Sequence, residues 1–521
     1  MIFKIIKKLY YQKKFSNHNK KVYDFSNLKV TNNLILVEFN RWTYLNVVKS
    51  YVVYVLKKKF NANVIAYESY TIYKKNSSLE NLKKKFLSLF NLGNYGVYNS
   101  FGVDRFIEYT PTDKQINKAQ NIVKKILLNK KLNKKTILNL KLEKIYIGDL
   151  VYDTYLKVYK KETLHISSED FKNYLKKSII LFIFWNDFIK KNRFKIKKNI
   201  IVHSSYLEGL QARICAFYKI DSYRISHKSI SKINKYNLYS GNELKKFRKV
   251  FSKFSPKKKE KIFNWSKSAI NKKLEITNQG IEKLKSFNKQ KKIQIVVSCH
   301  SFNDAPHAHG KFFFEDFYEW LKFLGKISDE TNYRWLIKPH PITYESDMKY
   351  LIQLKKKFKK FEILSKNFNN NLIIRKFKPD LALTCQGTIG YEYPFQGIKV
   401  INCGKNTPHN FFKFCFTPKD KKDYAKILRN FQNFDYKINK LEIMEYYFLR
   451  RKYIYVDFLN LKLIDSDTNG YKLIESFSRE NFYERWIKQF KTLNHHKTIQ
   501  IIQNYFHSND LILEPNHEKK G

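Results

Sequence analysis

The chain has 521 residues, of which 43% are hydrophobic and 17% aromatic, and its formal net charge is +56. This length exceeds what one hydrophobic core holds, so we expect more than one domain, and the aromatic content excludes a largely disordered chain. Only 13 of the 101 basic residues are arginine. Nucleic-acid readers favour arginine for bidentate contacts, so the dispersed lysines predict no nucleic-acid partner but a generally basic surface, suited to anionic substrates or an anionic membrane face.

The cysteines and the amino-terminal residues both favour a location inside the cell. The five cysteines are odd in number and show no CxxC spacing, which is typical of a reducing cytoplasm. Residues 1–29 form a basic lead without the apolar core of a signal peptide. The longest apolar run, 178–185, is far shorter than the roughly 20 residues that span a bilayer. We therefore expect a cytoplasmic protein that is either soluble or peripheral at the inner face of the membrane.

The first half opens with a strand, a helix and a strand. NLILVEFN (33–40) and NANVIAYES (61–69) have strand composition, and an apolar helical pattern lies between them. A lysine-rich, mostly helical region runs to about residue 195. NIIVHSS (199–205) is a further strand followed by a helix, and 240–288 is a charged helical stretch of linker character.

In the second half strands and helices alternate throughout. Strands are expected at 292–300, 333–338, 361–364, 379–385 and 399–404, with helices at 312–327 and 347–358. Such alternation predicts a parallel sheet that is covered on both faces. The fold class is therefore α/β, with two Rossmann-like domains, a cleft between them and a helical C-terminal extension. The expected parts are the lead (1–29), an N-terminal domain with helical insertions (30–288), a C-terminal domain (289–435) and C-terminal helices that pack back on both domains (436–521).

WLIKPHP (335–341) is an apolar strand that ends abruptly in Lys338 and His340. Its two prolines forbid further ladder pairing, so the chain must leave the sheet there. Lys338 offers a point charge and His340 a tunable donor, and both suit a phosphate. The alternative is a solvated lysine and a histidine that caps a loop.

TCQGTIGYEYPFQG (384–397) predicts a tight turn, permitted by Gly387 and Gly390, that opens a helix. Thr388 would cap this helix, whose first amides form an anion site. Glu392 lies one turn further along, where it would accept hydrogen bonds from a ribose diol. The alternative is an ordinary cap and a surface carboxylate. The strand order cannot be derived from the sequence, so the adjacency of this segment to WLIKPHP is an assumption.

SCHSFNDAPHAHG (298–310) follows the first strand of the second half. Its Ser298, His300 and Asp304 are expected to face a substrate or a phosphate. His307 and His309 lack the spacing of a metal site, and we expect neither a metal nor another cofactor.

KPHP and GTIGYEYPFQGIKVINCG resemble the nucleotide-binding half of bacterial capsule and surface polysaccharide glycosyltransferases of GT-B fold, including those that use CMP-Kdo; glycerophosphotransferases of cell-wall polymers share a related KPHP element. The resemblance covers 292–416 well and the N-terminal half weakly. It implies that Lys338 and His340 contact the donor phosphate and that Gly387, Thr388 and Glu392 hold the nucleotide. Gln386 stands where Ser or His is expected and departs from the family pattern.

IGDLVYDTYLK (147–157) also resembles a segment of such surface-carbohydrate proteins. A helix here would place Asp149 and Asp153 on one face. A transferase that inverts the anomeric configuration of the sugar needs a general base for the acceptor hydroxyl. Asp149 and Asp153 are both candidates for this base, and Glu208 and His203 are the alternatives. The alternative is that Asp149 caps the helix and Asp153 pairs with a lysine.

We therefore expect a glycosyltransferase that moves a sugar from a nucleotide-activated donor to a surface or capsular polysaccharide or a lipid-linked glycan. The alternatives are a GT-B-like non-hydrolysing sugar-nucleotide epimerase, a basic nucleic-acid-binding protein and a catalytically inactive scaffold of the same fold. The donor sugar, the base of the nucleotide and the acceptor cannot be derived from these motifs.

Overall fold

The structure is a computed structural model that describes most of the chain. The described residues are 2–69, 78–239, 241, 243–275, 292–341, 344–366, 368–405, 407–454, 456, 458–459, 481–490 and 492–518. The expected domain boundary at 288 and 289 lies outside them.

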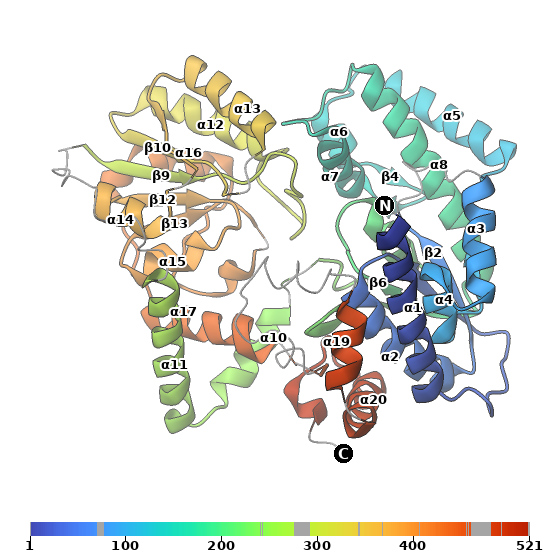
Figure 1. Ribbon diagram of the computed structural model, residues 1–521. Coiled ribbons are helices and arrows are strands. Elements are labelled where there is room, and N and C mark those ends of the chain that lie inside the picture. Colours follow the sequence, from blue (N-terminus) through green and yellow to red (C-terminus); the bar gives the residue numbers. More distant parts are fainter. Residues whose placement is uncertain are drawn as a thin grey trace.

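The N-terminal half is built on a six-stranded sheet of order β3-β2-β1-β6-β7-β8 (Figure 1). The strands are β1 (Leu34–Phe39), β2 (Asn63–Glu68), β3 (Arg105–Ile107), β6 (Ile196–Ile201), β7 (Ser222–Ser226) and β8 (Ser229–Ile233). All neighbours pair in parallel except β7 and β8, which form an antiparallel hairpin at one edge. A separate short hairpin joins β4 (Lys141–Leu142) and β5 (Ile145–Tyr146).

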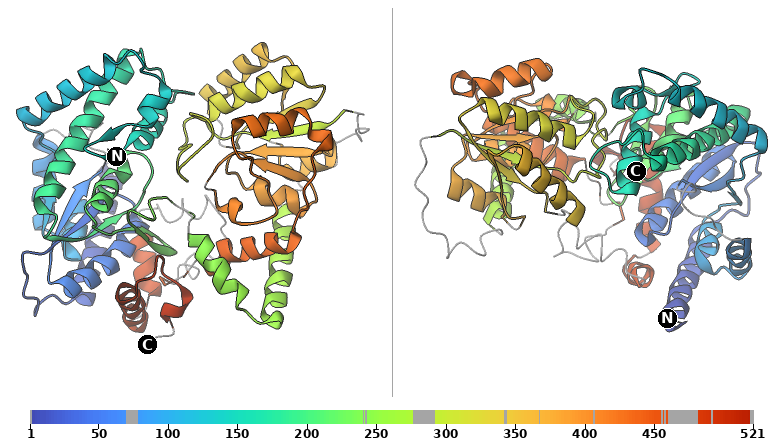
Figure 2. Two further views of the ribbon diagram at one scale, coloured as in Figure 1. Left: turned by 180° about the vertical axis from the view of Figure 1, so that it is seen from behind. Right: turned by 90° about the horizontal axis from the view of Figure 1, so that it is seen from above.

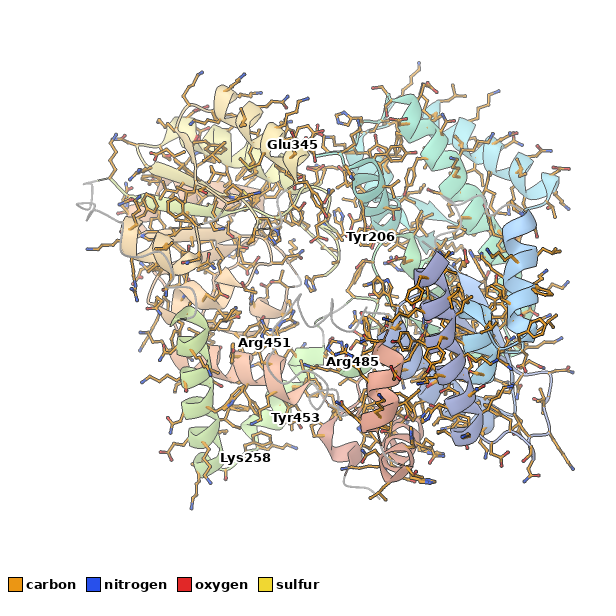
Figure 3. All side chains as sticks on the ribbon, in the orientation of Figure 1. Tyr206, Lys258, Glu345, Arg451, Tyr453 and Arg485 are labelled. Atoms are coloured by element: carbon orange, nitrogen blue, oxygen red, sulfur yellow. The ribbon has the colours of Figure 1, made fainter. Side chains whose placement is uncertain are left out.

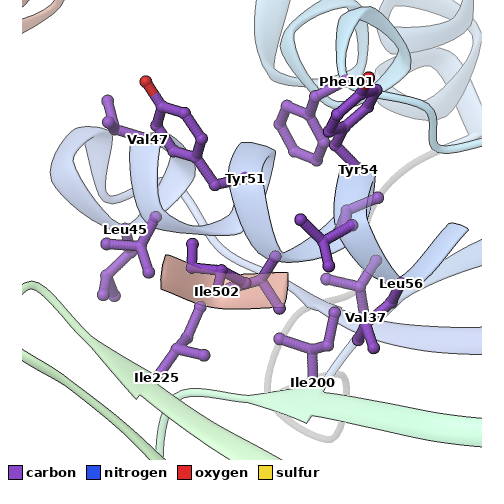
Figure 4. Packing of buried hydrophobic residues seen from close by; sticks show 14 of the residues in the cluster. Val37, Leu45, Val47, Tyr51, Tyr54, Leu56, Phe101, Ile200, Ile225 and Ile502 are labelled. Atoms are coloured by element: carbon purple, nitrogen blue, oxygen red, sulfur yellow. The ribbon is translucent and has the colours of Figure 1, made fainter. Parts of the chain in front are cut away.

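Helices cover both faces of this sheet because alternate residues of β1 enter two different cores. Ile35 and Val37 pack under α2, whereas Leu34 and Leu36 pack under α7 and α8. Figure 4 shows the first core, with Val37 and Ile200 from the sheet beneath Tyr51 of α2. The helices of this half are α1 (Ile2–Val22), α2 (Thr43–Phe60), α3 (Ser78–Leu89), α4 (Gly93–Ser100), α5 (Asp113–Leu127), α6 (Lys134–Leu138), α7 (Gly148–Tyr159), α8 (Glu169–Asn192) and α9 (Leu210–Phe217).

The C-terminal half is built on a five-stranded sheet of order β11-β10-β9-β12-β13, parallel throughout as predicted. The strands are β9 (Gln294–Ser298), β10 (Arg334–Lys338), β11 (Phe361–Ile363), β12 (Leu381–Thr384) and β13 (Lys399–Asn402). Its helices are α12 (Phe317–Glu330), α13 (Glu345–Lys357), α14 (Asn370–Phe377), α15 (Ile389–Phe395) and α16 (Lys421–Arg429).

Two helices that precede β9 in the chain also pack on the C-terminal half. These are α10 (Glu243–Ser252) and α11 (Pro256–Glu275). Phe247 of α10 and Ile270 of α11 are fully buried in the same core as Val296 of β9 and Val400 of β13. The charged stretch with linker character therefore contributes to the core of the second half.

The C-terminal segment returns from the second half to the first. α17 (Lys440–Phe448) packs on α11 and α15, whereas α19 (Phe482–Gln489) and α20 (Thr492–His507) pack on α1 and α2. Figure 2 shows these last helices beside the N-terminal half, away from the C-terminal sheet. The predicted fold class is confirmed: the chain forms two Rossmann-like α/β units in the manner of a GT-B fold, with a helical C-terminal extension.

Two sequence-based predictions of local structure were wrong, and one hairpin was not predicted. The helix expected from Phe312 begins at Phe317, because the Asp316 side chain caps it by accepting from the amide of Glu319. The strand expected at 199–205 runs over Ile196–Ile201. The β7–β8 hairpin was not predicted, and its edge is completed by residues 511–513, which bond to β8 from the far end of the chain. Among the described helices none is long and apolar enough to cross a membrane.

Candidate functional site

The strand order brings the predicted phosphate-binding segments together. β9 lies between β10 and β12, so the ends of these three strands are neighbours at one edge of the sheet. Ser298, at the end of β9, pairs in register with Lys338 at the end of β10. The strands that follow β9 are added on one side as β10 and β11 and on the other side as β12 and β13. Open parallel sheets bind ligands at such a switch point in the strand order. The adjacency that the sequence left as an assumption is therefore present.

Lys338 is a buried cation without an ionic partner. Its side chain is 4% exposed, and its Nζ donates to the carbonyl of Pro339 at 3.1 Å. No carboxylate of the described residues forms an ion pair with it. Burial lowers its pKa, an effect that the nearby Cys299 opposes. A buried ammonium group in this state is stabilised by an incoming anion.

His300 follows the end of β9 by two residues, and the amide of its neighbour Cys299 donates to the carbonyl of Lys338. The His300 ring stacks on Phe317 with centroids 4.5 Å apart, and its Nε2 has no hydrogen-bond partner. Burial lowers the pKa of His300 to about 4, with Asp304 opposing and His340 adding to the effect. The ring is therefore neutral at physiological pH. His340 is half-buried on the neighbouring strand end.

Asp304 joins the two halves. It is exposed and accepts a hydrogen bond from the Tyr206 hydroxyl at 3.0 Å. Figure 3 shows Tyr206 between the two halves, facing the loop after β9. The residues after β6 and those after β9 are thus in direct contact.

The turn after β12 is tight, but the expected threonine cap of the following helix is absent. Thr388 is exposed and makes no side-chain cap, so the predicted capping role was wrong. The Gly387 amide donates to Thr384 Oγ1 at 3.0 Å, and the Gly390 amide donates to the Gly387 carbonyl. Both amides therefore already have acceptors within the turn and the first residues of α15. Gln386 is half-buried at this turn.

Glu392 is a buried carboxylate and not a surface one, with a 3% exposed side chain. It forms an ion pair with Lys273 of α11 and accepts from Asn370 Nδ2 of α14 at 2.6 Å. Nearby Gly390 admits the ring of His409, because a Cβ at this glycine would lie 2.5 Å from His409 Cε1.

The N-terminal sheet has a pocket at its own switch point, between β1 and β6. Its volume is about 380 Å³, and the lining residues include Glu38, Trp42, Ser69, His203 and Glu208. The predicted rivals His203 and Glu208 therefore lie together in this pocket. Burial, with Lys157 and Arg224, lowers the pKa of His203 to about 4.

Glu38 in this pocket escaped the sequence analysis. Its carboxylate accepts from the Val202 amide at 2.7 Å and from Ser69 Oγ at 3.1 Å. Burial raises the pKa of Glu38, and Lys49 opposes this. The sequence feature that could have identified Glu38 is a single charged residue in the otherwise apolar strand LILVEF.

α7 presents Asp149 and Asp153 on one face, as the sequence predicted, but their partners differ. Asp149 accepts from Arg213 at 2.9 and 3.2 Å and from the Tyr239 hydroxyl at 3.0 Å. Asp149 is thus neutralised within the N-terminal half.

Asp153 pairs with a histidine of the other half and not with a lysine. Asp153 Oδ1 lies 2.6 Å from His307 Nδ1, and Oδ2 accepts from the His307 amide at 3.2 Å. Both side chains are buried, 2% and 4% exposed. Burial raises the pKa of Asp153 to about 6, against the charge of His307. For His307 burial lowers the pKa, but the charge and hydrogen bond of Asp153 prevail and raise it.

The structure therefore places the predicted residues in three groups. The first group surrounds the strand ends of the C-terminal sheet and consists of Ser298, His300, Lys338, His340 and Gln386. The second group, Glu208 and His203, lines the N-terminal pocket. In the third, Asp153 contacts His307 between the halves. Glu392 lies apart, among α11, α14 and α15. In the described part of the chain no group of three or more His, Cys, Asp or Glu side chains is arranged to hold a metal ion.

No family model and no curated protein matches the chain. Among solved structures, UDP-GlcNAc 2-epimerase from Neisseria meningitidis is 12% identical, covers 88% of this chain and 99% of its own, and gives a TM-score of 0.23. An O-GlcNAc transferase mutant from Thermobaculum terrenum is 8% identical, covering 94% and 74%, with a TM-score of 0.25. A glycosyltransferase from Rickettsia africae is 11% identical, covering 92% and 99%, with a TM-score of 0.24. Similarities this low establish nothing about the activity or the ligand of this chain.

Proposed function

We propose that the chain is a glycosyltransferase that moves a sugar from a nucleotide-activated donor to a surface or capsular glycan. The observation that carries the proposal is Lys338: a buried cation without an ion-pair partner, at the switch point of a parallel sheet whose edge meets a second Rossmann-like unit. Phosphates of a nucleotide sugar supply the missing counter-charge.

Three of the predicted donor-site residues have a role in this proposal. Lys338 and His340 bind the donor phosphate and stabilise the charge that develops as it leaves. His300, neutral in its buried position, donates or accepts a hydrogen bond at the same group. The resemblance of KPHP to polysaccharide glycosyltransferases agrees with these roles. Because the Gly387 and Gly390 amides are already bonded, the proposal does not rely on a helix terminus.

We place the acceptor at an anionic membrane surface, because α1 and α3 expose apolar side chains among lysines. Both helices pack on α4, which lies between them in Figure 1. On α1 the exposed residues are Phe3, Ile5, Ile6 and Tyr10; on and just after α3 they are Leu82, Phe86, Leu89 and Phe90. α1 contains seven lysines and no acidic residue. Such a surface suits an interfacial helix on anionic lipid.

The proposal is tested by incubating the full chain with UDP-, CMP-, GDP- and CDP-linked sugars. Binding is measured by calorimetry and turnover by nucleotide release. We expect one class to bind and Lys338→Ala to weaken its binding, while Lys399→Ala, at the opposite end of the same sheet, leaves binding unchanged. Equal binding by both variants contradicts the assignment. Conversion of the donor sugar without any acceptor identifies an epimerase instead.

A further inference from the structure

A second, larger pocket lies where the two halves meet. Its volume is about 830 Å³, and residues of both halves line it. The N-terminal half contributes Tyr146 and Tyr239; the C-terminal half contributes His307, Phe312 and a group of lysines.

This pocket adjoins the donor strand ends. Lys405, one of its lining residues, comes three residues after the end of β13. Gly404 beside it touches the end of β12, because a Cβ at Gly404 would lie 2.7 Å from the carbonyl oxygen of Cys385. A ligand in the pocket therefore lies next to the strand ends where the proposed donor binds.

The lining suits a carbohydrate that carries a negative charge. Lys311, Lys405, Lys421 and Lys422 line the pocket with a single carboxylate, Asp420. Lys421 pairs with Glu315 at 3.4 Å, whereas no carboxylate of the described residues lies within ion-pair distance of the other three. Aromatic rings beside these cations give the C–H faces of a sugar an apolar surface. The N-terminal pocket instead contains Glu38, Glu68 and Glu208, which disfavour an anion.

His307 is the histidine that lines this pocket, and its surroundings suit a group that accepts a proton. Its Nδ1 is held by Asp153, which is ionised at neutral pH, so Nδ1 carries the proton that it donates. When the ring is unprotonated, above its raised pKa, the lone pair resides on Nε2, and this buried atom has no hydrogen-bond partner. The two contacts of Asp153, to the ring and to the backbone amide, fix the orientation of the ring. This is the arrangement of a general base with an orienting carboxylate.

We infer that this pocket binds an acceptor sugar bearing a carboxylate or a phosphate, and that His307, oriented by Asp153, takes the proton from its reacting hydroxyl. This inference rests on the proposed glycosyltransferase function. As the hydroxyl proton passes to Nε2, the acceptor oxygen forms a bond with the anomeric carbon of the donor. The bond from that carbon to the phosphate oxygen breaks, and its electron pair leaves with the nucleotide. His307 later releases the proton to solvent.

Other charged groups around His307 agree with this role. Asp149 lies one turn away on α7 and is neutralised by Arg213. Asp316, on the other side, accepts from Tyr152 at 2.6 Å and from Thr163 at 2.5 Å. Asp153 is therefore the one of these three carboxylates that bonds to the His307 ring. It acts as a positioning residue, and His307 as the catalytic residue.

The first experiment tests the pocket without a donor. Glucuronic acid, glucose 6-phosphate and glucose are titrated into the full chain and observed by ligand-detected NMR. We expect one or both anionic sugars to bind at least about tenfold more tightly than glucose, a difference typical of a charge-assisted contact. Whichever binds identifies carboxylate or phosphate as the anion. Lys405→Glu should abolish the preference, while Lys360→Glu, a control on the far side of the C-terminal half, keeps it. Equal binding of all three sugars overturns the anionic site.

The second experiment tests the base, with the donor found by the nucleotide panel. His307→Gln should lower kcat by about 10²–10⁴-fold, the usual contribution of a general base, without changing nucleotide affinity. His495→Gln, a buried histidine on α20, should leave kcat unchanged. For the wild type, kcat should rise with pH through the pKa of His307. Asp153→Asn lowers that pKa, so the rise should move to lower pH.

The outcomes separate the two proposals. A His307→Gln variant that retains wild-type kcat overturns the base, and so does an Asp153→Asn variant that only loses thermal stability with an unchanged pH profile. If the wild type binds no nucleotide sugar, the glycosyltransferase proposal fails and the base fails with it. The sugar titration still tests whether the pocket binds an anionic sugar, because that experiment needs no donor.

Discussion

Asp153 of α7 and His307 of the loop after β9 form a buried ion pair, 2.6 Å apart, that joins the two halves of the chain. Tyr152 and Thr163, which contact Asp316, extend this junction. Lys134 pairs with Glu319 at 2.6 Å at its margin. The contact of the halves therefore depends on the protonation of Asp153 and His307, whose pKa values are both raised.

The first prediction concerns pH and stability. The folded pKa of His307 is raised above its ordinary value of 6.5 by Asp153, although burial opposes this. A group whose pKa is raised by folding contributes stability that is fully present below pH 6.5 and is lost as the pH rises through the folded pKa. Asp153→Asn removes this contribution. The Tm advantage of the wild type over Asp153→Asn should therefore shrink in thermal melts as the pH rises from 6.5 through the folded pKa. A difference that stays constant over this range contradicts the role of the pair.

Lys338 should lower the free energy of unfolding while it strengthens nucleotide binding. Its buried ammonium has no ion-pair partner among the described residues, so Lys338→Met should raise the free energy of unfolding by about 1–3 kcal/mol. The same variant should lose nucleotide binding. Urea denaturation and calorimetry measure the two effects. As a control, Lys399→Met should not be stabilised, because Lys399 pairs with Asp435. A destabilised Lys338→Met chain would show that the lysine serves the fold.

The apolar surface of α1 and α3 should bind anionic vesicles. We expect the chain to sediment with phosphatidylglycerol vesicles and not with phosphatidylcholine vesicles. Ile6→Glu and Phe86→Glu should each reduce the bound fraction, because both side chains are exposed, 59% and 60%. Phe194→Glu is the matched control, since Phe194 is 77% exposed at the end of α8. Equal loss in all three variants would indicate a general charge effect and not a docking surface.

Gly390 and His409 should be coupled in stability. A Cβ at position 390 would lie 2.5 Å from His409 Cε1 and 2.6 Å from Nδ1, so the ring must move. Gly390→Ala should destabilise the chain by about 1–3 kcal/mol, the range for overpacking. In a His409→Ala background the same change should cause a much smaller loss, which a double-mutant cycle in urea measures. Additive effects would show that the two residues do not meet.

Local patterns in the sequence were sufficient for most of the fold. The apolar strands around Val37, Val296 and Leu336 are buried on both faces, and such runs between amphipathic helices are specific to parallel sheets. The end of β10 at Lys338 followed from its prolines. Helix ends were harder: a single side chain, Asp316, decides where α12 begins.

Periodicity within a few residues is sufficient to predict the two α/β units, the strand-end segments and the face of α7 that carries Asp149 and Asp153. Which of these groups act together depends on how the complete elements pack. The tertiary structure placed β9 between β10 and β12, gave Arg213 to Asp149 and His307 to Asp153, and buried Glu392 against Lys273. These partners lie 64 to 154 residues apart in the chain. Local periodicity carries no information over such separations, because packing of complete elements selects the pairs.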